Sequence, residues 1–63
     1  MKIYLQKIRW EKDYSIGKLA KLSGVSTAQI SRIENGLTIP TIETLCRLAK
    51  ALDCDVTDLF DCD

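Results

Sequence analysis

Apolar residues recur every three or four positions along most of the chain, and this spacing predicts an all-α fold of five short helices. Runs of alternating β-branched residues, which would indicate strands, are absent from the sequence. The predicted helices cover residues 3–13, 16–22, 26–34, 42–52 and a last short segment over 56–60. The length suits one domain, so we expect residues 1–63 to form a single unit.

Capping residues stand before the predicted second and third helices. Ser15 is the expected N-cap of the second helix and Ser26 that of the third, where Gln29 completes a Ser-x-x-Gln capping box. Gly24 lies between the two helices, at a position suited to a positive φ. Two short helices joined by such a turn predict a helix-turn-helix over about residues 16–34.

The inward faces of these helices predict the core. The expected core residues are Leu5, Ile8, Leu19, Ala20, Leu22, Ile30, Ile33, Ile42, Leu45, Cys46, Leu48, Ala49 and Leu52. Thr41 is the expected N-cap of the fourth helix, and Asp55 that of the last. Leu37 and Ile39 lie in the loop before Pro40. With Ile16 they could form an exposed apolar patch of the kind that marks a protein interface, but we expect Leu37 and Ile39 to tuck beneath the loop and fill the core.

Composition argues against several classes of function. The chain has three cysteines without a C-x-x-C pair and no histidine, so we expect free thiols, no metal and no cofactor. A nucleophile–base pair and a phosphate loop are both absent, so the chain is not expected to be an enzyme. No run approaches the ~20 apolar residues of a membrane span. A protein of the reducing cytoplasm, without membrane association, is the expectation.

Charge is unevenly distributed although the formal net charge is zero. Residues 1–33 carry seven basic and two acidic side chains, whereas residues 34–63 carry two basic and seven acidic ones. The basic half indicates a local site for a polyanion, although ordinary solvated helix faces would give the same counts.

The predicted helix-turn-helix suggests what the basic half binds. A short helix supported from behind by another presents an outer face whose width suits the major groove of B-DNA. Free N–H groups at the start of the second helix suit a phosphate, and Lys18 and Lys21 lie on that helix's exposed side. Double-stranded DNA is therefore the predicted partner.

The segment "SIGKLAKLSGVSTAQISRIENGLTIPTIETLCRLAKALDCDVTDLF" resembles the Cro/cI-type helix-turn-helix domain of the XRE family. The most specific parts are "LAKLSGVSTAQISRIENG" and "PTIETLCRLAKAL". The resemblance implies a lambda-repressor-like fold and a sequence-specific transcriptional regulator, a repressor that binds a two-fold operator as a homodimer. For the contact between copies, the candidates are Val56, Leu59 and Phe60 on the last helix. The acidic run of Asp53, Asp55, Asp58, Asp61 and Asp63 opposes that contact.

The resemblance also implies roles for single residues. Thr27, Ala28 and Arg32 match positions that commonly reach bases, and Arg32 has the two donors that fit guanine O6 and N7. The expected contacts to phosphate or sugar come from Lys18, Lys21, Gln29, Ser31 and Asn35. Each of these DNA contacts has a structural alternative. Arg32 could instead form a surface ion pair, and Gln29 and Asn35 could instead cap the helix.

Arg9 and Glu34 match a pair that joins the first helix to the end of the third in similar proteins. An arginine fork on a carboxylate would lock the reading helix against the body of the domain. The implied role is structural.

Three features depart from the family's pattern. Ile16 stands where a glutamine usually reaches phosphate, and it is expected to place an apolar side chain at the DNA-facing edge. The loop of residues 37–40 carries no charge, and Gly17 lies inside the second helix, where it costs roughly 1 kcal/mol against alanine. Trp10 is expected to be partly exposed, packing near Phe60 or anchoring a partner. The neutral net charge, Ile16 and the uncharged loop favour an alternative function, a protein-interaction module or antitoxin-like regulator with weak DNA affinity and a protein partner.

Overall fold

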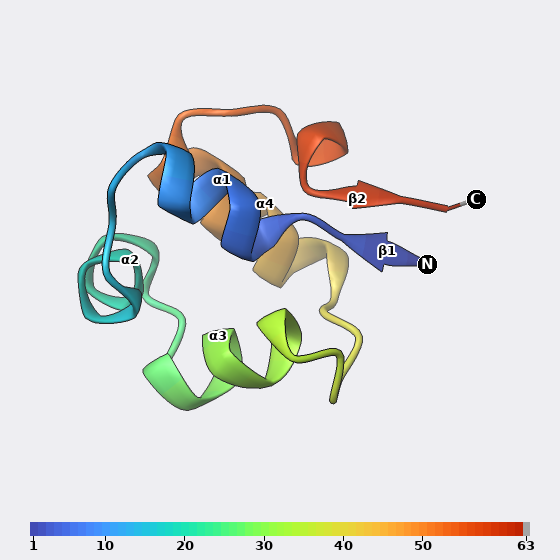
Figure 1. Cartoon of the computed structure of the whole chain (residues 1–63), viewed down its shortest axis with the longest axis horizontal. Helices are drawn as coiled ribbons and strands as arrows, with labels where there is room; N and C mark the ends of the chain where they lie inside the picture. Colours follow the sequence, from blue (N-terminus) through green and yellow to red (C-terminus); the bar gives the residue numbers. More distant parts are fainter. Residues whose placement is uncertain (63) are drawn as a thin grey trace.

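The computed structural model describes residues 1–62, and within that range it has four α-helices, one 3₁₀ turn and a two-stranded sheet (Figure 1). The elements in chain order are β1 (Lys2–Ile3), α1 (Leu5–Glu11), α2 (Ile16–Ser23), α3 (Thr27–Glu34), α4 (Ile42–Leu52), η1 (Val56–Asp58) and β2 (Phe60–Asp61). In Figure 1, α1 crosses in front of α4, α2 lies at the left, and α3 runs along the bottom. The mostly helical fold that the sequence predicted is confirmed.

The C-terminal segment differs from the prediction. The expected fifth helix is a single 3₁₀ turn, and β2 follows it and pairs with β1 in antiparallel register, Lys2 opposite Asp61 and Ile3 opposite Phe60. This pairing brings the chain ends together at the right of Figure 1. Two-residue strands are too short to leave a period-two pattern in the sequence. Asp63, the last residue of the acidic run, lies outside the described residues.

The predicted N-caps of α2, α3 and α4 are confirmed. The hydroxyls of Ser15, Ser26 and Thr41 each accept a hydrogen bond from the backbone N–H three residues further on, at 3.0 to 3.1 Å. Each bond satisfies one of the free N–H groups at the start of its helix. The starts of α2, α3 and α4 are therefore determined by neighbouring residues in the sequence.

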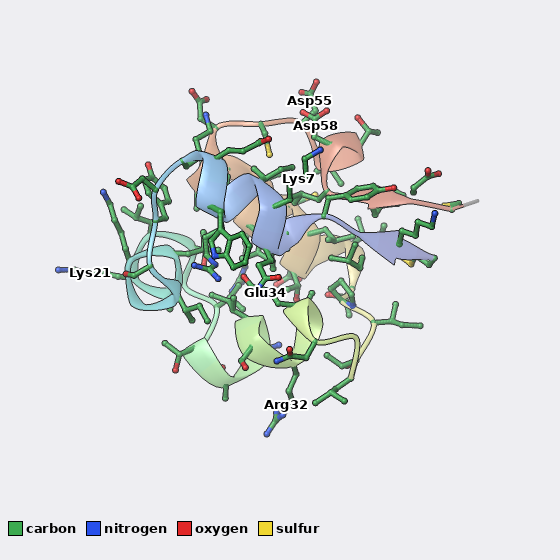
Figure 2. All side chains as sticks on the ribbon, in the orientation of Figure 1. Lys7, Lys21, Arg32, Glu34, Asp55 and Asp58 are labelled. Atoms are coloured by element: carbon green, nitrogen blue, oxygen red, sulfur yellow. The ribbon has the colours of Figure 1, made fainter. Side chains whose placement is uncertain are left out.

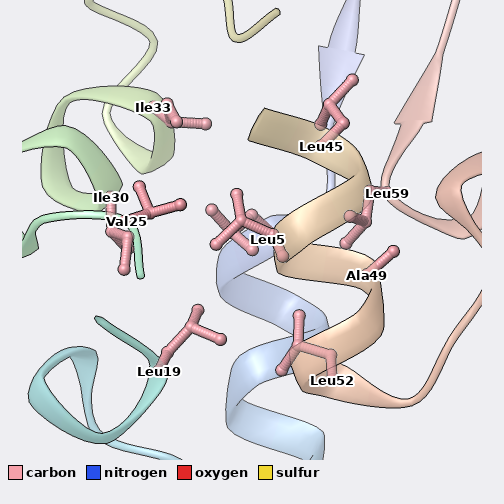
Figure 3. Packing of buried hydrophobic residues seen from close by; sticks show 10 residues of the cluster. Leu5, Leu19, Val25, Ile30, Ile33, Leu45, Ala49, Leu52 and Leu59 are labelled. Atoms are coloured by element: carbon pink, nitrogen blue, oxygen red, sulfur yellow. The ribbon is translucent and has the colours of Figure 1, made fainter. Parts of the chain in front are cut away.

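The core lies between α1, α2, α3 and α4 (Figure 3). Its buried residues are Leu5, Leu19, Val25, Ile30, Ile33, Leu45, Leu48, Ala49, Leu52 and Leu59. Three residues expected in the core, Leu22, Ile42 and Cys46, are exposed instead. On α4 the predicted apolar face was too wide, because only the stripe that contains Leu45, Leu48, Ala49 and Leu52 can point inward from one helix.

The loop between α3 and α4 also contradicts the prediction. Leu37 and Ile39 are both exposed and do not fill the core. Ile30 and Ile33 on one side and Leu45 on the other already occupy the interior beside this loop. The prediction was wrong because apolar character gives no information about which way a loop side chain points.

Gly24 ends α2 with φ = 76°, and we expect Gly24→Ala to lower the free energy of unfolding by about 1 kcal/mol. A Cβ at Gly24 meets no atom within 4 Å, so the cost comes from the backbone conformation alone. Gly17→Ala is the matched control, because a Cβ there makes only an ordinary contact with Ser15 Oγ at 3.9 Å and favours the helix. Chemical denaturation should therefore give shifts of opposite sign. Equal shifts would contradict this account.

Candidate nucleic-acid interface

Two neighbouring elements support α3 from behind. α3 packs against α2 and against α1, and it buries Ile30 and Ile33 on its inner side. The turn between α2 and α3 is short because Gly24 takes the left-handed conformation and Val25 enters the core. One side of α3 is thus fixed to the body, and the opposite side faces solvent.

The outer side of α3 carries the residues expected to read bases. Thr27, Ala28 and Arg32 are all exposed. Ala28 and Arg32 are one helical turn apart, so they lie on the same strip of the helix. Figure 2 shows the Arg32 side chain pointing away from the body of the domain, at the bottom of the view. The guanidinium is therefore accessible to a ligand that lies along α3.

Ser31 and Asn35 form a local pair at the end of α3. The Asn35 side-chain amide donates to the Ser31 carbonyl oxygen at 2.9 Å and approaches its hydroxyl oxygen at 3.4 Å. Asn35 therefore caps the C-terminal end of α3, and Ser31 is half-buried. Gln29 is exposed, and its backbone N–H is held by Ser26.

Lys18 lies near the N-terminus of α2 and has a defined position. Its ammonium nitrogen is 4.4 Å from the centre of the Tyr14 ring, a cation–π distance. Tyr14 immediately precedes the Ser15 cap, so the ring ties this charge to the turn that leads into α2. Sequence reasoning missed Tyr14, because it precedes α2 and helical spacing does not apply across the turn. Lys21 is also exposed, and in Figure 2 it leaves α2 sideways whereas Arg32 points downward.

Arg9 and Glu34 form a bidentate ion pair beneath α3. Arg9 Nε donates to Glu34 Oε2 at 2.7 Å, and Nη2 donates to Oε1 at 3.0 Å. The Arg9 and Glu34 side chains are only 8% and 3% exposed. The hydrogen bond to Glu34 raises the pKa of the Arg9 guanidinium. Arg9 Nη1 also donates to the Tyr14 carbonyl oxygen at 2.9 Å, so a single guanidinium joins α1, the α1–α2 turn and the end of α3.

Ile16 is more buried than expected, whereas Trp10 is exposed, as the sequence predicted. Ile16 is half-buried and packs against the core, so it does not expose an apolar side chain at the start of α2. Trp10 is 63% exposed and lines a shallow hollow with Asp13, Tyr14 and Ser15. It therefore flanks the α1–α2 turn rather than the segment that contains Phe60.

Among residues 1–62, no cluster of three or more Cys, Asp or Glu side chains could hold a metal ion. The cysteines are free, and burial is the main cause that raises the pKa of the Cys54 thiol. Within the same range, no helix has the length and apolar character needed to cross a membrane.

Comparison with known proteins identifies the class of protein that has this fold and an exposed helix such as α3. A family model described as helix-turn-helix matches residues 5–59. The chain is 43% identical over 54 residues to the HTH-type transcriptional regulator SlrR of Bacillus subtilis, covering 84% of this chain and 36% of SlrR. It is 47% identical over 49 residues to the HTH-type transcriptional repressor RghR of the same organism, covering 76% of this chain and 36% of RghR.

A solved structure agrees with these relatives. The crystal structure of the restriction-modification controller protein C.AhdI from Aeromonas hydrophila has a TM-score of 0.85 and 32% identity, covering 89% of this chain and 85% of that one. The chain belongs to the helix-turn-helix family, and within it to the Cro/cI (XRE) type of DNA-binding domain, as its resemblance implied. It spans only about a third of the length of SlrR and RghR.

Proposed function

We propose that this domain binds operator DNA in a sequence-specific manner and represses transcription, with α3 in the major groove. The observation that carries this proposal is the outer face of α3, where Arg32 projects from a short helix that the Arg9–Glu34 pair ties to the body. RghR, with which the chain shares 47% identity, is named a repressor, and this supports repression rather than activation. A cytoplasmic location follows from this role.

The proposed base contacts come from Thr27, Ala28 and Arg32. Arg32 suits a guanine, because two parallel donors can reach O6 and N7 together. The Thr27 hydroxyl suits a base edge or a phosphate, and the Ala28 methyl suits a thymine methyl. Lys18, Lys21, Gln29, Ser31 and Asn35 are proposed to lie along phosphate or sugar. Of these, Lys18 has the strongest support because Tyr14 already holds it near the start of α2.

A duplex selected by the protein from a randomised library provides the test. Fluorescence anisotropy should give tighter binding to the selected duplex than to a scrambled one at moderate salt, because base contacts discriminate whereas phosphate contacts do not. Equal affinity for both duplexes would exclude sequence-specific reading. No binding at low salt would favour the alternative, a module that binds a protein partner through exposed apolar residues.

Removing the Lys18 charge should weaken the contact with the DNA backbone. We expect Lys18→Ala to reduce the slope of log K against log salt by about one and to affect both duplexes alike. Lys50→Ala is the control, because Lys50 is an exposed cation in the last turn of α4, on a different helix. Anisotropy titrations at several salt concentrations measure these slopes. If the slope of log K against log salt is unchanged in Lys18→Ala, Lys18 does not contact the DNA backbone.

A further inference from the structure

An exposed apolar patch lies immediately after α3. Its residues are Leu37, Ile39 and Ile42, which are 75%, 76% and 69% exposed and fall within six positions of the chain. Isolated apolar residues on a surface need no explanation, but a contiguous group of large ones usually marks an interface. We propose that this patch, called here the loop patch, is the surface through which two copies of the chain associate.

The backbone holds the loop patch in a fixed conformation. The Leu37 N–H donates to the Arg32 carbonyl oxygen at 2.9 Å, and the Gly36 N–H donates to that of Ile33 at 3.2 Å. At the other end, the Thr41 hydroxyl caps α4, and Pro40 restricts φ. Because the loop is anchored at both ends, binding at the patch requires little additional ordering of the chain.

The charges around the loop patch favour a second copy as the occupant. A two-fold contact brings each surface against itself, so its charges must be self-complementary. Residues 35–42 contain no charged side chain. On the α3 side the nearest charges are Glu34, which is buried against Arg9, and the exposed Arg32, which points away from the body. On the α4 side they are Glu43 and Arg47, which pair at 2.9 Å and are equal and opposite. Across a two-fold axis, Glu43 of one copy can therefore face Arg47 of the other without like-charge repulsion.

The segment that the sequence suggested for this contact is not available. Leu59 is fully buried, and Val56 and Phe60 are half-buried against the same core. Exposing these side chains to a second copy would open the domain. The acidic residues Asp55, Asp58 and Asp61 also surround this segment, and two such surfaces would repel each other.

The size of the loop patch sets the strength of the association. Three aliphatic side chains at this exposure offer on the order of 300 to 400 Å² per copy. Two copies would then bury about 600 to 800 Å² at the patch, below the roughly 1,200 Å² of a standard stable interface. We therefore expect a weak dimer in solution, which DNA would strengthen by binding both copies.

If the domain binds DNA as proposed, a two-fold axis at the loop patch would allow the α3 helices of both copies to reach the same face of the DNA. Half-sites one helical turn apart place each reading helix roughly 17 Å from the two-fold axis. The chain from the middle of α3 to Ile39 can span at most about 20 Å. An axis at the patch is therefore compatible with both helices entering successive major grooves.

Sedimentation velocity of the whole chain without DNA tests the association separately from DNA binding. Wild type should shift reversibly from monomer to dimer as its concentration rises to about 1 mM, and Ile39→Asp should weaken association at least tenfold. Leu22→Asp is the matched control, because it places the same charge on an exposed aliphatic residue of a different element, α2, and should associate like wild type. Circular dichroism verifies that each variant is folded.

Cys46 supplies a second readout, because it is exposed one helical turn after Ile42. In a protein with Cys54→Ser and Cys62→Ser, a bismaleimide should link Cys46 to Cys46, and adding Ile39→Asp should abolish the linked dimer. A wild type that remains monomeric throughout, or an Ile39→Asp protein that associates like wild type, would overturn the proposal. Neither result depends on whether the domain binds DNA.

Discussion

Glu34→Ala should lower the free energy of unfolding by about 3–5 kcal/mol, because it leaves the Arg9 guanidinium buried without its counter-charge. A domain of this length has a total stability of only about 3–9 kcal/mol. The variant should therefore be extensively unfolded near physiological temperature, although Glu34 contributes nothing to the hydrophobic core. Thermal and urea denaturation followed by circular dichroism measure the loss.

Glu43→Ala is the matched control for Glu34→Ala. Glu43 pairs with Arg47 at 2.9 Å, but both side chains are more than half exposed. Solvent screens such a pair, and its loss should cost no more than about 0.5 kcal/mol. A Glu34→Ala protein as stable as Glu43→Ala would show that the Arg9–Glu34 pair does not hold α3 to the body. Replacing both partners together, Arg9→Met with Glu34→Leu, should cost less than Glu34→Ala alone.

Arg32→Ala should weaken binding to the selected duplex by about 10- to 100-fold, the range expected for one bidentate contact to guanine. Binding to a scrambled duplex should fall much less, so the preference for the selected sequence should be largely lost. Arg32 is exposed and points away from the body, so the substitution should leave the stability of the domain unchanged.

Arg32→Lys separates charge from geometry. A lysine keeps the positive charge but cannot present two parallel donors to a base. If Arg32 contacts a base edge, the lysine variant should retain binding to the scrambled duplex and still lose most of the preference. Equal losses on both duplexes in Arg32→Ala would instead assign Arg32 to a phosphate.

The boundaries of α2, α3 and α4 were predictable because local chemistry determines them. Ser15, Ser26 and Thr41 cap helices within three residues of their own position, and Gly24 ends α2 through its own backbone conformation. The first helix was predicted over residues 3–13 but covers only Leu5–Glu11, because no side chain caps its start and Lys2–Ile3 pairs as β1. The β1–β2 pairing was not predictable in this way. It joins Lys2 to Asp61 across nearly the whole chain, and it depends on the packing that brings the two ends together.

The surface was harder to predict than the core. Leu37, Ile39, Ile42 and Cys46 are apolar in the sequence, yet all four are exposed in the structure. On α4, apolar residues cover more of the circumference than can face inward, so composition alone could not separate Ile42 from Leu45. The supporting contact between Lys18 and Tyr14 was missed because it crosses from the α1–α2 turn into α2.

The central claim is that the outer face of α3 contacts DNA, and amide chemical shifts measured by NMR test it most directly. Titrating the selected duplex into labelled protein should shift the amides of Thr27, Ala28 and Arg32 most, with a further group around Lys18. The amides of η1 and β2 lie elsewhere in the fold and should change little (Figure 1). Shifts concentrated around Trp10 or along η1 and β2, with α3 unchanged, would contradict the account.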